Sequence, residues 1–350
     1  MSSADDARAP KLPAQLVDAT QLSYRSVGLG IYAVVVRYST MPFEKIAMIM
    51  NSSQVSGSNQ LQQASRIVFS GGLLTPYRTV GRASIVAWFF QYSVMGFIFQ
   101  ICDRSLSHLM GVRRVVYGAE LMEPPKTQAM EPTTTHPKFS AADEAKFFAK
   151  AGLAPALAGG IESLVCNRAE AQRFYGIPKL AAIETQLNWN AVARACGPGF
   201  VANASRNFVM SATSFVATPT LYQRYFPQEK KSQSSLFWFG LAVNIFGGNV
   251  VAITQQALWG RSLDYGAVGG GRNISYGAVV REGLKAEGAA AFFTLPKWFS
   301  RVMMNAPIQG TVPWFYNEIL PCGEPAAMRA ASWLYQGIAK RGREAKGIPQ

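Results

Sequence analysis

Residues 232–260 read SQSSLFWFGLAVNIFGGNVVAITQQALWG and contain no charged side chain. A second uncharged stretch, ASIVAWFFQYSVMGFIFQIC, covers residues 83–102 between Arg82 and Asp103. A helix needs about 20 mostly apolar residues to cross the ~30 Å hydrocarbon core of a bilayer, and both stretches are long enough. They therefore predict two membrane-spanning helices.

The overall composition also indicates a membrane protein. Of the 350 residues, 49% are hydrophobic and 15% are charged, compared with about 25% charged in typical soluble chains. A chain this apolar does not remain disordered in water. The net charge is +14, but the basic residues flank the uncharged stretches instead of forming one stripe, which argues against a nucleic-acid partner.

Metal, disulfide and enzymatic chemistry find little support in the sequence. The 4 cysteines stand far apart without a C-x-x-C pair, and the 2 histidines do not complete a usual zinc set with them. No combination of residues typical of hydrolysis or redox catalysis is visible, so we expect no enzymatic activity. The stretch Met1–Lys11 has two aspartates and no apolar run, so any organelle address is expected to be internal.

Four further segments bring the expected number of membrane-spanning helices to six. The uncharged runs 207–223 and 302–317 are long enough if the arginines that precede them lie partway into the membrane. Residues 27–50 and 146–166 are apolar but contain charges, which are costly in lipid and are expected to face a bundle interior or a water-filled cavity. The alternative is a four-helix protein in which these two segments form buried or interfacial helices.

The six segments pair off into a threefold repeat, each pair containing a polar motif and an aromatic turn. The motif starts are Pro42, Arg168 and Asn249, and the turn aromatics are Tyr77, Phe200 and Phe293. Two markers that recur together are typical of a tandem repeat. A Pro/Thr-rich insertion from Ser107 to Ser140 lengthens the first interval and is expected to have little packed structure. The expected organisation is an N-terminal extension (1–24), repeat 1 (25–106), an insertion loop (107–142), repeat 2 (143–226), repeat 3 (235–320) and a basic tail (321–350).

These repeats resemble the mitochondrial carriers, whose odd helices end in the motif P-x-[DE]-x-x-[KR]. Pro42 and Glu44 match the first copy, and Glu170 and Arg173 match the acid and cation of the second, whereas the third copy at 249–254 has lost all three positions. The stretch KAEGAAAFF in repeat 3 is similar to the family's turn before an even helix. The resemblance implies an all-α membrane protein with six transmembrane helices in three pseudo-threefold repeats and short matrix helices.

The resemblance also implies a gate on the matrix side. In the family, the acid of one repeat pairs with the cation of the next and closes the cavity. Here one such pair is expected, Glu44 with Arg173, because Ala47, Val251 and Thr254 stand where charged residues belong. The sequence therefore predicts a weakened matrix gate.

The gate on the intermembrane side is reduced as well. The family places [FY]-[DE]-x-x-[KR] at the ends of the even helices. In this chain Gln100 follows Phe99 and Asn317 follows Tyr316, so amides replace the acids. Such amides are expected to brace the helices by hydrogen bonds worth roughly 1 kcal/mol each, without an electrostatic lock.

Between the gates, the resemblance implies a substrate site on the even helices. Arg206, followed by Asn207, and Arg301 fall at the matching depth, and an arginine cluster in a cavity attracts a carboxylate, a phosphate or an anionic lipid. Val86 or Trp88 fills the third position and offers no charged group. The alternative, which this apolar third position favours, is that both arginines brace neighbouring helices or reach the matrix headgroups.

Two functions follow from these expectations. The favoured one is a transport-incompetent accessory subunit of a larger complex of the mitochondrial inner membrane, such as a respiratory-chain complex or ATP synthase. The other is an active carrier of anionic metabolites. Both place a multi-pass chain in the inner membrane with its termini and insertion loop towards the intermembrane space. The expected partners are membrane lipids and other subunits; no cofactor is expected, and cardiolipin or another anionic lipid is the candidate for a bound molecule. The basic tail suits either anionic lipid or a protein surface.

Overall fold

A computed structural model describes residues 13–51, 55, 57, 59–78, 82–116, 121–122, 141–175, 199–268 and 276–345. Of these residues 89% are helical and none lies in a strand, which confirms the expected all-α class for the described part of the chain. The main helices are α1 (Ala14–Ser39), α2 (Met41–Met50), α3 (Gln60–Val68), α4 (Thr75–Arg78), α5 (Arg82–Met110), α6 (Ala141–Tyr175), α9 (Phe200–Ser211), α10 (Thr218–Tyr225), α11 (Gln233–Val243), α12 (Asn249–Val268), α13 (Tyr276–Glu287), α14 (Leu295–Asn305), α15 (Val312–Trp314) and α16 (Leu320–Ala345).

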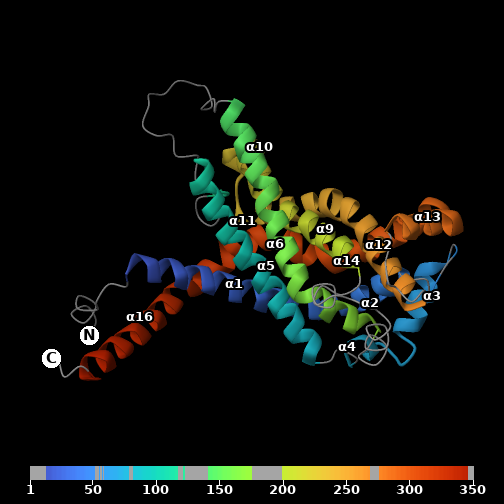
Figure 1. Cartoon of the computed structure of the whole chain (residues 1–350), viewed down its shortest axis with the longest axis horizontal. Helices are drawn as coiled ribbons and strands as arrows, with labels where there is room; N and C mark the ends of the chain where they lie inside the picture. Colours follow the sequence, from blue (N-terminus) through green and yellow to red (C-terminus); the bar gives the residue numbers. More distant parts are fainter. Residues whose placement is uncertain are drawn as a thin grey trace.

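The long helices pack against one another in chain order. α1 lies against α5, α5 against α6, α6 against α9, α9 against α12, and α12 against α14. α14 in turn packs against α2, which continues from α1 after a break at Thr40, so this series of helices closes on itself. Figure 1 shows α5 and α6 side by side, with α3 and α13 at the opposite end of the molecule from the outward-running α16.

Two helical runs in the described residues are long and apolar enough to cross a membrane. They span Ser84–Met110 and Gln233–Asp264, and they contain the two uncharged stretches of the sequence. In each run 39% of the most apolar 18-residue stretch is buried, so the larger share of that stretch is at least partly exposed.

Prolines and π-helical turns interrupt the long runs. Pro42 occupies the first turn of α2, where no backbone N–H is required, and this explains the break after Ser39. The runs from α9 onward contain widened turns that are typical of inserted residues. These π-helical turns are η3 (Ala212–Ala217), η5 (Asn244–Gly248), η7 (Ala306–Gly310) and η8 (Phe315–Ile319). The turns η3, η5 and η7 contact one another. The helical runs that contain α10, α11 and α14 therefore pack against each other through π-helical turns.

Gly240 shows how closely two of these runs approach. A Cβ added at Gly240 of α11 would lie 2.1 Å from the carbonyl oxygen of Gly310 in η7. The two backbones therefore touch without an intervening side chain, which only glycine permits at this position.

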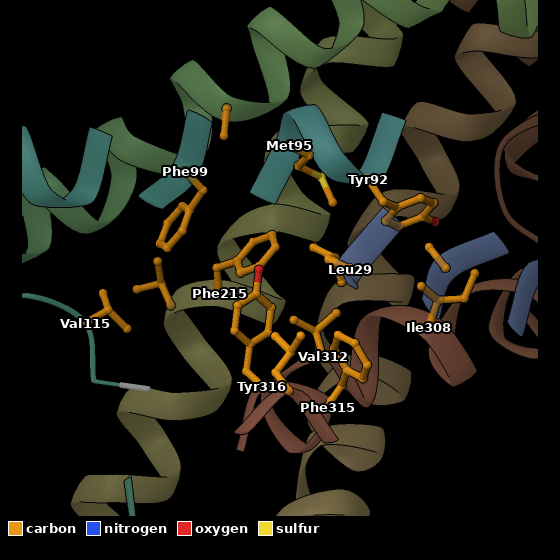
Figure 2. Close-up of a cluster of buried hydrophobic side chains, with 14 of the residues drawn as sticks. Leu29, Tyr92, Met95, Phe99, Val115, Phe215, Ile308, Val312, Phe315 and Tyr316 are labelled. Atoms are coloured by element: carbon orange, nitrogen blue, oxygen red, sulfur yellow. The ribbon is translucent and has the colours of Figure 1, made fainter. Parts of the chain in front are cut away.

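An aromatic and aliphatic core fills the ring of helices near the ends of α5 and η8. Figure 2 shows Phe99, Phe215 and Tyr316 gathered with their neighbours in this cluster. The rings of Phe99 and Phe215 stack with centroids 4.8 Å apart, and Tyr32 stacks on Phe315 at 4.2 Å. Such pairs contribute roughly 0.5–1.5 kcal/mol each beyond their buried area, so this end of the ring is held firmly together.

Several element boundaries differ from those expected from the sequence. α1 begins at Ala14, inside the segment expected to be an N-terminal extension, and α5 continues to Met110, past the expected end of repeat 1 at 106. Residues 320 and 321 both lie in α16, so the expected tail is the continuation of a helix. Most of the insertion and the expected matrix helix of repeat 2 lie outside the described residues.

Candidate functional site: a buried polar network

The charged residues of the first two helical runs are joined inside the ring. Arg37 of α1 donates from Nε to Oε2 of Glu44 in α2 at 2.9 Å, and from Nη1 to Oε1 of Gln91 in α5 at 2.9 Å. Gln91 donates from Nε2 to Oε1 of Glu170 in α6 at 2.7 Å. Gln91 therefore connects the Arg37 guanidinium of α1 to the Glu170 carboxylate of α6.

The same chain of contacts continues through the other half of the ring. Arg206 of α9 donates from Nη2 to Oε2 of Glu170 at 2.9 Å and from Nη1 to Oε1 of Gln256 in α12 at 2.8 Å. Arg301 of α14 donates from Nη1 to the same Gln256 oxygen at 2.9 Å. With its amide oxygen turned towards the guanidinium, Asn305 accepts from Arg301 at 2.6–3.0 Å.

We call this series the ring network. Its members, in the order of the contacts, are Glu44, Arg37, Gln91, Glu170, Arg206, Gln256 and Arg301. Each member is buried, and α1, α2, α5, α6, α9, α12 and α14 each supply one of them. The network therefore follows the packing order of the helices and ties each to the next.

Aromatic rings cover two of the three guanidinium groups. Arg37 lies over the ring of Trp88 with Cζ 5.5 Å from its centroid, and Arg206 lies over Trp259 at 5.6 Å. Cation–π contacts strengthen as water is excluded, and both arginines are buried. Trp88 thus covers Arg37, which is a role that the sequence interpretation did not assign to it.

A second set of polar contacts holds α6 to α9. Asn207 donates from Nδ2 to Glu162 and, at 3.0 Å, to Oγ of Ser163. Asn203 donates to Oδ1 of Asn167 at 2.9 Å. Every one of these side chains is buried, so their mutual hydrogen bonds offset the cost of removing them from water.

Charge is distributed unevenly over the ring network. Glu44 and Glu170 form ion pairs with Arg37 and Arg206, each at 2.9 Å. Among the described residues, Arg301 contacts amide oxygens and no carboxylate within ion-pair distance. Arg301 is therefore the guanidinium whose charge is least neutralised by direct contact.

The residues expected at the matrix gate are placed as follows. Pro42 lies in the first turn of α2, and Glu44 contacts Arg37 two helical turns earlier in the same run. Glu170 contacts Arg206 and Gln91 instead of a residue of the third motif. The side chain of Arg173 lies outside the described residues, so its expected pairing with Glu44 stays a prediction.

The amides expected at the other gate lie in two separate contacts. Gln100 donates from Nε2 to the hydroxyl oxygen of Tyr316 at 3.3 Å, which joins α5 to η8. Asn317 donates to Oε1 of Gln233 at 2.9 Å, which joins η8 to the start of α11. These bonds brace neighbouring helices, as the sequence suggested for amides in place of acids.

The first residues of the insertion lie across this same end of the ring. Asp103 pairs with the buried Lys150 at 2.7 Å, and its other oxygen accepts from the backbone N–H of Val115 at 3.2 Å. Val115 enters the aromatic core, and Leu121 packs in full burial against Tyr222 of α10. We call residues 111–116 and 121–122 the crossing segment, because they lead from α5 and α6 to α10 and α11.

The arginines expected at a substrate site do lie together. Arg206 and Arg301 share the Oε1 atom of Gln256, and Asn207 accepts from Arg206 at 3.1 Å. The sequence interpretation missed Arg37, Gln91 and Gln256 as partners. The available signal was that each is a polar side chain within a predicted membrane-spanning stretch, where such residues are costly unless paired.

Comparison with known proteins adds no assignment to this geometry. No protein-family model matches the chain, and no curated protein matches its sequence.

Proposed function

We propose that this chain is a carrier-fold integral protein of the mitochondrial inner membrane, with six transmembrane helices in three pseudo-threefold repeats. Three features support this proposal. The motif remnants at Pro42 and Glu170 resemble the carrier signature, the helices close into a ring in chain order, and two runs are apolar enough to span a bilayer. Both termini are assigned to the intermembrane space, on the side where α5 ends.

Within this fold, we propose the role of a transport-incompetent accessory subunit of a larger inner-membrane complex. The ring network carries the proposal. In a carrier, an anionic substrate needs free guanidinium groups, but the carboxylate of Glu170 already occupies Arg206 at 2.9 Å. The chain thus supplies internally the counter-charge that a substrate would bring.

Alternating access requires two conformations that are close in energy. To separate its helices at this level, the chain would have to break buried contacts between charged groups, each of which costs several kcal/mol when one partner is left unpaired. One such ion pair joins separate helical runs, Arg206 of α9 with Glu170 of α6, whereas Arg37 and Glu44 pair within the α1–α2 run. Breaking the pair between α6 and α9 raises the free energy of an open state above that of the closed one.

The opposite end of the ring is filled by apolar packing. The stacked rings of Phe99 and Phe215 pack together with Val115 of the crossing segment in one buried apolar cluster. Polar contacts thus join the helices at one end of the ring and apolar contacts join them at the other. This arrangement suits a rigid structural protein better than a transporter that changes conformation.

The deciding experiment is native purification of the tagged full-length chain in mild detergent, followed by native electrophoresis. We expect the chain to migrate in fixed stoichiometry with a large inner-membrane complex and to show no saturable exchange of anionic metabolites in proteoliposomes. Migration as a free monomer together with saturable exchange would refute the accessory role. Alkaline carbonate extraction separately tests membrane integration, since release into the supernatant would refute the proposed location.

Arg301 favours the second candidate, an active carrier of small anions. It is buried and has no carboxylate within ion-pair distance among the described residues. If Arg301 binds an anion, dicarboxylates or phosphate raise the thermal midpoint of the purified protein, and Arg301→Gln abolishes that increase. No change of the midpoint with any such anion supports the accessory role.

A further inference from the structure

The distal part of α16 extends away from the rest of the molecule. Near its start, α16 contacts α1: Tyr24 donates to the carbonyl oxygen of Leu320 at 2.9 Å, and Gln21 donates to Glu324 at 2.8 Å. Beyond Pro325, the described residues of α16 make no hydrogen bond, ion pair or aromatic contact with another element. In the view of Figure 1, α16 runs outward across the direction of α5 instead of continuing along it.

The outward face of distal α16 is apolar and basic. Trp333, Leu334 and Ile338 are 74%, 56% and 70% exposed, and Arg329 and Arg341 are exposed as well. At about 100° per residue, Leu334, Ile338 and Arg341 share one side of the helix, with Trp333 at its edge and Arg329 beyond Trp333. The sequence that follows, AKRGREAK at 339–346, adds further basic residues.

A helix with this exposed apolar face is expected to pack against another surface. Most helical stability in proteins comes from packing of an apolar face, and an exposed tryptophan with two large aliphatic neighbours adds a hydrophobic cost. The covering surface must therefore accept a bulky apolar strip with arginines at both of its ends.

The pattern along this strip distinguishes a lipid surface from a protein helix. Packing against a partner helix requires large apolar residues every three or four positions along the contact face. On the turns before and after Trp333, these positions hold Ala330, Gly337 and Arg341. A tryptophan and aliphatic side chains flanked by arginines are instead typical of helices at the interface of an anionic membrane. The net charge of this part of the chain is complementary to such a surface.

We propose that α16 from Arg329 to Arg341 binds an anionic lipid surface, with Trp333, Leu334 and Ile338 at the headgroup boundary. This inference rests on the proposed membrane location of the ring of helices, because that location brings the start of α16 to the bilayer surface. The segment then acts as a lipid-dependent anchor beside the paired ends of α1 and α16.

Hydrogen exchange of the full-length protein in nanodiscs tests this inference. We compare discs of phosphatidylcholine alone with discs that also contain cardiolipin, and follow peptides that cover residues 329–341. We expect roughly 30-fold slower exchange in the anionic discs, about fivefold for each of the two arginines, and a loss of this difference at high salt.

Matched variants make the result specific. Arg329→Gln with Arg341→Gln is expected to reduce the dependence on cardiolipin about 30-fold, whereas Arg281→Gln, an exposed arginine on α13, leaves it intact. Exchange peptides from α5 report in each case that the helical ring is folded. Equal exchange in both kinds of disc overturns the inference, as does protection that appears only in the purified native complex, which would identify a protein partner. A chain that fails to enter discs at all would instead refute the proposed membrane location.

Discussion

Glu170→Gln is the most informative single change in the ring network. The substitution keeps the shape of the side chain and its contact with Gln91, but removes the charge that pairs with Arg206 at 2.9 Å. Arg206 and Glu170 are 6% and 3% exposed, so water does not replace the lost partner. Leaving one member of a buried pair uncompensated costs about 3–5 kcal/mol. At ~2 °C per kcal/mol for a large chain, the thermal midpoint should fall by roughly 6–10 °C.

A thiol-reactive fluorophore in detergent measures this midpoint. Cys166 is buried in α6 close to Glu170, so it reacts when the ring opens, and Cys322→Ser removes the background from an exposed thiol. The matched control is Glu287→Gln, which breaks a pair with Arg261 whose side chains are 24% and 14% exposed. That pair should contribute no more than about 1 kcal/mol, or ~2 °C.

A double substitution completes a double-mutant cycle for Glu170 and Arg206. Combining Glu170→Gln with Arg206→Gln removes both charges, and the two amides can then bond to each other, so we expect it to restore at least half of the lost stability. The reasoning is refuted if Glu170→Gln melts within the range of the Glu287 control, or if the effects of the two single variants simply add.

Three further predictions concern the rest of the ring. Lys150→Met should remove the cation that pairs with Asp103 and so loosen the crossing segment. Tryptic cleavage after Arg113, measured by mass spectrometry, should then increase at least ~tenfold. The control Lys146→Met changes an exposed residue one turn earlier and should leave the cleavage rate unchanged. Gly240→Ala should lower the free energy of unfolding by about 1–3 kcal/mol because its Cβ would meet the facing backbone. The control Gly247→Ala has open space there and should be neutral or slightly stabilising in the same thermal assay. Tyr316→Phe removes one hydrogen bond of 3.3 Å and should cost about 1 kcal/mol in that assay, so a change above 3 kcal/mol would contradict a simple brace.

Some features of the fold could be predicted from local sequence. The uncharged stretches at 83–102 and 232–260 predicted helices because few charges interrupt them, and both lie in long apolar helices. The break at Thr40 is also explained locally, because Pro42 lacks a backbone donor and lies in the first turn of α2. Both features depend on properties of short segments of the sequence.

The partners in the ring network could not be predicted in this way. Glu44 was expected to reach a cation of the next repeat, yet the contact that the structure describes is with Arg37, seven positions earlier. The kink at Thr40 sets which side chains of α1 and α2 face each other, and its angle is not encoded in a motif. Gln91 and Gln256 match no signature, and their roles depend on how each helix is rotated towards the interior.

The strict chain order of the ring network bears on how the protein is made. Each link joins a helix to its next neighbour around the ring, so in the proposed membrane location a chain inserted from its N-terminus can complete the links one at a time. The contact between α14 and α2, like those of α1 with α16 and η7, unites distant parts of the sequence. A polypeptide cut short before residue 295 would therefore hold Arg206 satisfied but leave α2 without its last neighbour, and such incomplete products should be recognised and degraded by membrane proteases.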